Sequence, residues 1–224
     1  MRYQTAVFDL DGTLLDTLED LYLATNAALE SHSLPRRSRD EVRLFVGNGV
    51  EMLIRRAVPS CTDEETTLAV LADFKTTYAA ICEDHTRPYD GILDMLRALR
   101  EKGIRVAVVS NKFDAATKQL CEKYFGALVE VAIGERAGVR KKPAPDTVYE
   151  ALKELGVTAE GRAKGRAKGA VYIGDSDVDI ETARNCGMPC ISVTWGLRDE
   201  EFLIANGATT LVHTPENLLG VIIV

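Results

Sequence analysis

Two carboxylates stand near the beginning of the chain, directly after the short apolar run Thr5–Phe8. They belong to Asp9 and Asp11, and Gly12 follows them. On an extended segment, side chains two residues apart point the same way, so we expect the two carboxylates to share a face. Adjacent carboxylates repel each other, and a divalent cation would relieve that repulsion. Such a pair also occurs in ordinary solvated turns, so by itself it identifies no activity.

Three later segments supply further chemical groups, the first and third of them at the ends of apolar runs. Ser110–Lys112 supplies hydroxyl and nitrogen donors, Lys141–Asp146 supplies cations in a proline-containing turn, and Asp175–Asp179 supplies more carboxylates. Ligands of open α/β sheets bind at the carboxyl ends of strands, so we expect these groups to meet Asp9 at one sheet edge. Each segment has an ordinary alternative, such as a cap serine, a solvated lysine or an acidic helix start. Their joint occurrence favours a binding or catalytic site.

The elements that would position these groups follow an α/β pattern. Predicted strands are Thr5–Phe8, Ile104–Val109, Val129–Ile133, Ala170–Ile173, Cys190–Val193 and Thr210–Val212. Helical periodicity marks Ile92–Arg100, Ala115–Lys123, Thr147–Leu155 and Ile180–Cys186, with glycines at the expected helix stops. Near-continuous apolar strands that alternate with helices indicate a Rossmann-like parallel sheet covered on both faces.

One region breaks the alternation and carries only helical signals. Between Thr17 and about Arg87, apolar residues recur at the spacing of one helix face, as in Leu18, Leu21, Tyr22, Thr25, Ala28 and Leu29. Ser38–Glu41 and Thr62–Glu65 each match the capping-box pattern of a helix start. We therefore predict an all-helical cap domain over 16–87, inserted into an α/β core made of 1–15 and 88–224.

Composition excludes several functional classes. The 224 residues include 46% hydrophobic and 27% charged residues, as in globular proteins, and the formal net charge of −7 gives no reason to expect nucleic-acid or acidic-membrane binding. No stretch approaches the roughly 18 apolar residues that span a bilayer, and no export signal is apparent. The odd number of cysteines, five without a CxxC pair, is typical of reduced thiols. These features predict a cytoplasmic protein.

A direct repeat interrupts the later part of the chain. Gly161-Arg162-Ala163-Lys164 is followed at once by Gly165-Arg166-Ala167-Lys168. The repeat could form a basic phosphate-binding patch, but surface loops accept small duplications at little entropic cost. We interpret it as a lengthened surface loop.

Taken together, these motifs resemble the haloacid dehalogenase superfamily of phosphohydrolases over essentially the whole chain. The family's DxDGT motif is complete at Asp9–Thr13, and its serine, lysine and acidic motifs match Ser110, Lys142, and Asp175 with Asp179. Members with a helical cap between the first two motifs share the organisation predicted above. Among them the likeness is strongest to phosphoglycolate phosphatases, judged from the run Asp11–Thr17, Val46–Val50, Ser110–Lys112 and Gly174–Ser176.

The resemblance implies a role for each matching residue. Asp9 would be the nucleophile that becomes phosphorylated, and Asp11 the general acid and then the general base. Ser110 and Lys142 would complete the catalytic set by binding and neutralising the phosphoryl group. The resemblance further implies substrate binding by Thr13, Ser110, Asn111, Lys142 and the cap residue Asn48. It implies a Mg²⁺ cofactor held by Asp9, Asp11 (through its backbone carbonyl), Asp175 and Asp179.

The expected partner is a small phosphorylated metabolite, bound by a monomer or homodimer that takes neither nucleic acid nor membrane. Two alternative functions of the same family remain open, a phosphoglucomutase-like enzyme and a pyrophosphatase, because both need Asp9 and Asp11. A catalytically silent binding or regulatory protein is a third alternative, although it would have lost at least one catalytic group. Substrate choice would rest on the cap, where Asn48, Arg43, Arg55 and Arg56 are candidates.

Overall fold

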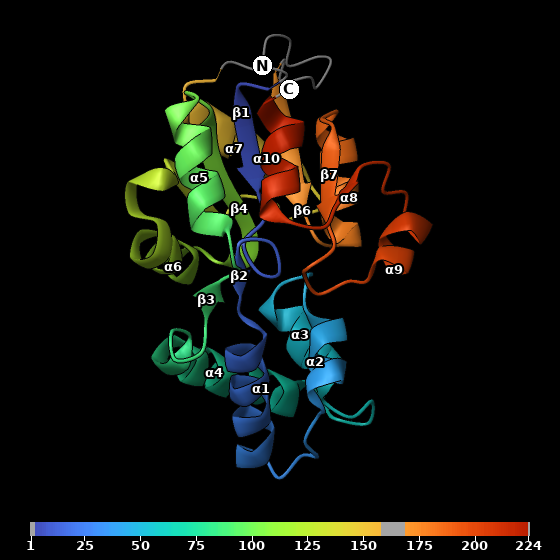
Figure 1. Cartoon of the computed structure of the whole chain (residues 1–224). Helices are drawn as coiled ribbons and strands as arrows, with labels where there is room; N and C mark the ends of the chain where they lie inside the picture. The colour runs from blue at the N-terminus through green and yellow to red at the C-terminus, as the bar shows by residue number, and fades with distance from the viewer. Residues whose placement is uncertain (1–2, 158–168, 224) are drawn as a thin grey trace. The chain divides into compact units, whose positions relative to one another are not determined.

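The computed structural model describes residues 3–157 and 169–223, so the direct repeat lies outside the described residues. The chain divides into two compact units (Figure 1). The core unit comprises Met1–Leu15 and Pro88–Val224, and the helical unit comprises Asp16–Arg87. The chain passes between them through β2 (Leu15–Asp16) and β3 (Arg87–Pro88), which pair as a small sheet of their own.

The described residues of the core unit contain a six-stranded sheet in the order β5-β4-β1-β6-β7-β8. Every pairing between neighbours is parallel; the strands are β1 (Thr5–Phe8), β4 (Arg105–Phe113), β5 (Val131–Glu135), β6 (Ala170–Gly174), β7 (Cys190–Val193) and β8 (Leu211–Val212). Numbered along the chain within this sheet, the order is 3-2-1-4-5-6, that of Rossmann folds. The chain changes direction across the sheet between β1 and β6, which is where such folds bind their ligands.

Helices cover both faces of this sheet, as the strand composition predicted. Figure 1 shows α5 (Ile92–Glu101) and α10 (Pro215–Ile223) in front of the sheet and α7 (Asp146–Glu154) behind it. Side chains from β1, β4, β5 and β6 share one buried cluster with α7 and with α8 (Asp177–Cys186). The remaining elements are α6 (Asp114–Phe125), the 3₁₀ turn η1 (Gly126–Leu128) and α9 (Glu200–Ala205). The Rossmann-like α/β fold is thereby confirmed.

Most element boundaries agree with the sequence-based prediction, and the differences have local causes. β4 runs four residues further than predicted, to Phe113, so that Ser110–Lys112 lie within the strand. β5 begins two residues late because η1 precedes it. α8 begins three residues early, at Asp177, where Ser176 and Asp179 form a capping box. Apolar periodicity detects only the buried part of such a helix, whereas the polar first turn is set by the cap.

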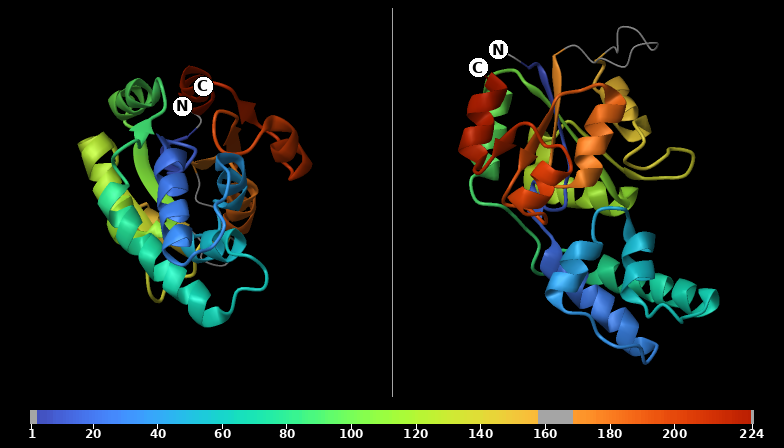
Figure 2. Two further views of the ribbon diagram at one scale, coloured as in Figure 1. Left: turned by 90° about the horizontal axis from the view of Figure 1, so that it is seen from below. Right: turned by 90° about the vertical axis from the view of Figure 1, so that its right-hand side faces the viewer.

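The helical unit, seen from two further sides in Figure 2, contains four helices within its described residues. They are α1 (Leu18–Ser31), α2 (Arg39–Phe45), α3 (Val50–Ala57) and α4 (Glu64–Ile81). The predicted apolar face of α1 is confirmed, since five of its six residues are buried and Tyr22 is partly exposed. In α4 the rings of Phe74 and Tyr78 stack with centroids 5.5 Å apart and are fully buried.

The two predicted helix starts of this unit differ in outcome. Ser38 forms the expected capping box with Glu41, with bonds of 3.2 and 2.7 Å. The second box is wrong by one residue, because Asp63 and not Thr62 is the N-cap of α4. The Asp63 carboxylate accepts the backbone N–H of Thr66 at 2.7 Å and its hydroxyl at 3.0 Å. A carboxylate at the positive end of a helix outcompetes a neighbouring hydroxyl for the cap position.

A buried carboxylate closes the helical unit near the point where the chain leaves it. Asp20, in the first turn of α1, is 0% exposed. It accepts the backbone N–H groups of His85 and Thr86 and the Thr86 hydroxyl, with distances of 2.8–3.1 Å, and contacts His85 Nδ1 at 2.9 Å. This Asp20 clasp ties the start of α1 to the segment that precedes β3.

Candidate active site

The turn after β1 brings Asp9 to the carboxyl edge of the sheet. The Asp9 N–H continues the pairing with β6 by donating to the Ile173 carbonyl at 2.9 Å, and its Oδ1 accepts the Leu10 N–H at 2.7 Å. Gly12 adopts φ +85°, where a side chain would be strained, and a Cβ there would collide with the carboxylate of Asp175. The glycine of the motif therefore allows this turn to lie directly against the end of β6.

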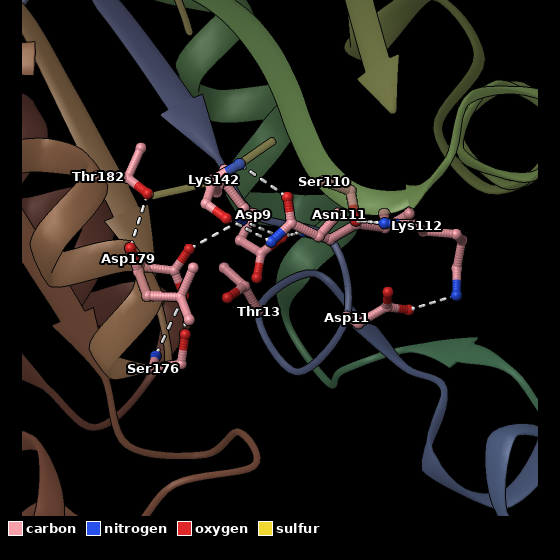
Figure 3. A network of polar contacts seen from close by, with 12 residues as sticks. Asp9, Asp11, Thr13, Ser110, Asn111, Lys112, Lys142, Ser176, Asp179 and Thr182 are labelled. Atoms are coloured by element: carbon pink, nitrogen blue, oxygen red, sulfur yellow. Dashed lines mark hydrogen bonds and ion pairs between the residues drawn. The ribbon is translucent and has the colours of Figure 1, made fainter. Parts of the chain in front are cut away.

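Lys142 stands at the centre of a buried polar cluster (Figure 3). Its Nζ lies 2.8 Å from Asp9 Oδ1, 2.9 Å from Asp179 Oδ1 and 3.0 Å from the Tyr172 hydroxyl. Its backbone is fixed by Asn111, whose side-chain oxygen accepts the Lys142 N–H at 2.8 Å while its amide donates to the Lys142 carbonyl at 2.9 Å. The predicted Asn111 and Lys142 thus act as a pair that joins β4 to the segment before α7.

The two acidic residues after β6 are oriented by different partners. Asp175 Oδ1 accepts the Thr13 hydroxyl at 3.1 Å, and its Oδ2 accepts the Leu197 N–H at 2.6 Å. Asp179 Oδ2 accepts both the N–H and the hydroxyl of Ser176, at 3.1 and 2.6 Å. Asp179 Oδ1 accepts the Tyr172 hydroxyl at 2.9 Å in addition to its contact with Lys142.

These carboxylates form a group that could hold a metal ion. Oxygen atoms of Asp9, Asp175 and Asp179 all lie within 4.8 Å of one another, and all three residues are buried. Burial, followed by the charge of Asp179, raises the pKa of Asp9 well above its ordinary value and that of Asp175 to about 7. Burial lowers the pKa of Lys142, but the carboxylates of Asp179 and Asp9 outweigh it and raise that pKa. The single ammonium group of Lys142 does not neutralise all three carboxylates when they are ionised. The remaining negative charge suits a divalent cation that prefers oxygen ligands.

Asp11 lies apart from this group. Its Oδ1 is 3.0 Å from Lys112 Nζ, and Figure 3 shows its carboxylate turned toward Lys112. The expectation that Asp9 and Asp11 share a face does not hold, because β1 ends at Phe8 and the alternation of extended chain ends with it. The two carboxylates of the motif therefore pair with two different lysines.

Ser110 and Asn48 complete the set of sequence-predicted site residues. Ser110 is buried near the end of β4, and its Oγ accepts the Lys112 N–H at 3.1 Å. Asn48 belongs to the helical unit, where its Oδ1 accepts a bond from Arg56 at 2.8 Å. Arg55, in the same unit, is bound to Glu51 and Glu64 at 2.6–2.9 Å. The structure thus brings Asp9, Thr13, Asn111, Lys142, Asp175 and Asp179 together, and leaves the role of Asn48 a prediction.

Sequence reasoning missed three contributors to the site. Tyr172 binds both Lys142 and Asp179, the Leu197 N–H orients Asp175, and Trp195 donates from Nε1 to the Thr13 carbonyl at 3.0 Å. The hydroxyl of Tyr172 in an otherwise apolar strand was a usable signal, since a buried hydroxyl requires a partner. A backbone donor such as that of Leu197 leaves no trace in the residue types.

Comparison with known proteins agrees with this geometry. Residues 6–193 match the family model of haloacid dehalogenase-like hydrolases, and the chain belongs to this family. It is 34% identical over 214 residues to the phosphoglycolate phosphatase of Caulobacter vibrioides, covering 94% of this chain and 86% of that protein. It is 29% identical over 224 residues to the N-acetylmuramic acid 6-phosphate phosphatase of Pseudomonas aeruginosa, covering 99% and 96%.

A solved structure extends the comparison to the fold. A candidate phosphoglycolate phosphatase from Lactobacillus delbrueckii subsp. bulgaricus superposes with a TM-score of 0.90 at 38% identity, covering 99% of each chain. The chain is accordingly a phosphoric monoester hydrolase. Phosphatases of this family use a divalent metal, and an acidic group that could hold one is present around Asp9. Among the helices of residues 3–157 and 169–223, none has the length and apolarity needed to cross a bilayer.

Proposed function

We propose that this enzyme hydrolyses phosphoglycolate through a phosphorylated Asp9, with Mg²⁺ as cofactor. The observation that carries the proposal is the position of the Asp9 carboxylate at the switch point of the sheet, in contact with Lys142 and next to Asp175. A nucleophile for phosphoryl transfer needs a fixed direction and nearby positive charge, because the phosphoryl oxygens repel it. The Leu10 N–H fixes the direction of the Asp9 carboxylate, and Lys142 supplies the positive charge.

The chemistry divides between Asp9 and Asp11. An oxygen of Asp9 bonds to phosphorus while the ester bond breaks, and Asp11 gives its proton to the leaving oxygen. Asp11 then takes a proton from the water that hydrolyses the aspartyl phosphate. Lys142 neutralises phosphoryl charge. The Ser110 oxygen accepts the Lys112 N–H, which leaves the hydroxyl hydrogen to be donated to a phosphoryl oxygen.

The hydrogen-bond partners of the three carboxylates favour direct cation binding by Asp9 and Asp175, and the family resemblance adds the backbone carbonyl of Asp11. A carboxylate offers about four lone-pair positions, and Asp179 accepts bonds from Lys142, Tyr172 and twice from Ser176. We therefore assign Asp179 to the support of Lys142 and to contact with the cation through water. When bound by these residues, Mg²⁺ would supply positive charge that stabilises the phosphoryl oxygens.

The choice of phosphoglycolate rests on the relatives and on the helical unit. One relative acts on phosphoglycolate and another on N-acetylmuramic acid 6-phosphate, and both esters carry a carboxylate in the leaving group. We propose that the helical unit (16–87) is a cap that selects the leaving group, with Asn48 among its contacts. If the carboxylate of the leaving group finds a hydrogen-bond donor in the cap, kcat/KM should be about tenfold to a hundredfold higher than for esters that lack this carboxylate.

Release of free phosphate from a panel of esters tests this proposal. We expect kcat/KM for phosphoglycolate to exceed that for N-acetylmuramic acid 6-phosphate, glucose 6-phosphate, glucose 1-phosphate and pyrophosphate. Asp9→Asn should remove turnover by more than about a thousandfold while leaving the fold intact, because the amide is a poor nucleophile of the same shape. A preference for another compound would overturn the substrate, and turnover of Asp9→Asn within about tenfold of wild type would overturn the nucleophile.

A further inference from the structure

The ion pair between Asp11 and Lys112 is a second buried contact between a carboxylate and a lysine at the site. The Lys112 side chain is 1% exposed, and its Nζ lies 3.0 Å from Asp11 Oδ1. Removing a lysine from water costs several kcal/mol unless a partner compensates it. Because Lys142 is proposed to bind the phosphoryl group, the second buried ammonium group, that of Lys112, must have a different role.

The base of the Lys112 side chain is held in place by its strand. The Lys112 N–H donates to Ser110 Oγ at 3.1 Å, and its carbonyl accepts the Thr117 hydroxyl from α6 at 3.3 Å. The pairing of β4 with β5 shifts register between Val109 and Phe113, at the segment that contains Lys112. Lys112 is therefore anchored on the sheet, whereas Asp11 lies on a turn.

Two lysines keep the two carboxylates of the turn separate. Asp9 and Asp11 are two residues apart, and Lys142 attracts any carboxylate within reach. If Asp11 were drawn to Lys142, it would compete with Asp9 for the same ammonium group. With Lys112 as its own cation, Asp11 leaves the contact of Asp9 with Lys142 undisturbed.

We infer that Lys112 is the positioning residue of Asp11, holding this carboxyl group where it meets the leaving oxygen of the substrate. The inference rests on the proposed function, in which Asp11 is the general acid. When the ester bond breaks, its electron pair goes to the leaving oxygen and the Asp11 proton follows. Lys112 acts through Asp11, so its removal harms only those reactions that need this proton.

Esters with different leaving groups test the inference. The alkoxide from phosphoglycolate needs a proton, whereas p-nitrophenolate departs without one. For Lys112→Met we expect kcat/KM to fall about tenfold to a hundredfold with phosphoglycolate and less than about threefold with p-nitrophenyl phosphate. The parameter kcat/KM is used because it reports the steps up to departure of the leaving group. Asp11→Asn should show the same contrast, and adding Lys112→Met to it should change little.

Lys118→Met is the matched control, because Lys118 forms an exposed ion pair with Asp114 on α6 and should be neutral with both esters. An equal loss of Lys112→Met with both esters would show a structural role, and no loss with either would show that Asp11 needs no positioning; both outcomes overturn the inference. If Asp11→Asn itself shows no contrast between the esters, the general-acid role in the proposed function fails instead.

Discussion

Asp9 and Asp11 carry the same functional group, and their surroundings differ. Burial, and then the neighbouring carboxylate of Asp179, raise the pKa of Asp9, which contacts Lys142, while Asp11 pairs with Lys112. The difference comes from a turn of five residues in which Gly12 alone adopts a positive φ. Identical residue types thus acquire different partners through a local change in backbone direction.

Tyr172 is the residue whose loss should best reveal how firmly Lys142 is held. In Tyr172→Phe, Lys142 and Asp179 each lose one hydrogen-bond partner in a buried environment. We expect the free energy of unfolding to fall by about 1–3 kcal/mol and kcat to fall about tenfold, because the ammonium group is no longer fixed. Chemical denaturation and steady-state kinetics check this, with Tyr149→Phe on the exposed side of α7 as control. Unchanged kcat would mean that Asp9 and Asp179 suffice to place Lys142.

The members of the site differ in how far the sequence could predict them. Asp9 and Asp175 were identifiable because each directly follows an apolar run that ends at the sheet edge, and Lys142 was identifiable from its match to the lysine motif of the family. The direction of the Asp11 side chain was not, since it depends on dihedral angles after the strand has ended. The partner of Asp175 is a backbone N–H at Leu197, and any residue type could supply it.

At the scale of elements, the Asp20 clasp joins two segments 65 residues apart in sequence. α1 begins the helical unit, and His85 and Thr86 stand at its end. Four donor groups converge on one fully buried carboxylate, so the clasp stabilises the unit as a closed body.

Asp20→Asn should destabilise the helical unit strongly. The amide nitrogen of the asparagine is a donor, and it would lie against groups that are themselves donors. We therefore expect a loss of about 3–5 kcal/mol in the free energy of unfolding. Asp73→Asn is the matched control, because Asp73 also contacts a histidine, His32, at 2.9 Å, but is half exposed. Urea unfolding followed by circular dichroism compares the two variants. Equal small losses would show that water replaces the clasp without cost.

Strand and helix positions were largely predictable because burial on both faces leaves continuous apolar runs, as in β1 and β7. The boundaries that failed depend on polar contacts. The start of α8 depends on Ser176, and the start of α4 depends on Asp63 outcompeting Thr62. Such choices between neighbouring polar residues are decided by bonds that residue order alone does not reveal.

At the scale of the whole molecule, the acidic group links stability to pH and to cation binding. The pKa of Asp175 is about 7 in the folded protein and about 3.9 for a free aspartate, so between these values the folded state binds more protons than the unfolded one. Without a cation, this group therefore costs stability as pH rises through about 7. A divalent cation binds the ionised carboxylates, so its stabilising effect should grow over the same range.

We accordingly expect Mg²⁺ to raise Tm more at pH 8 than at pH 6. Thermal unfolding with saturating Mg²⁺ and with a chelator, at both values, measures the two increments. In Asp175→Asn the increment at pH 8 should largely vanish. An increment that is equal at both pH values would place the cation away from these carboxylates.

The insertion of the helical unit also affects how the sheet can assemble. β1 and β4 are neighbours, yet Thr5 and the residue it pairs with, Arg105, are about 100 residues apart along the chain. The helices between them form from contacts close in sequence, and β2 and β3 then hold Asp16 and Arg87 together. Once this has happened, only about 29 residues remain to be closed, which lowers the entropic cost of pairing β1 with β4 by about 1 kcal/mol. The inserted unit thus turns a distant pairing of the core into a nearly local one, and folding that begins with the insertion should bring Asp9 and Ser110 together early.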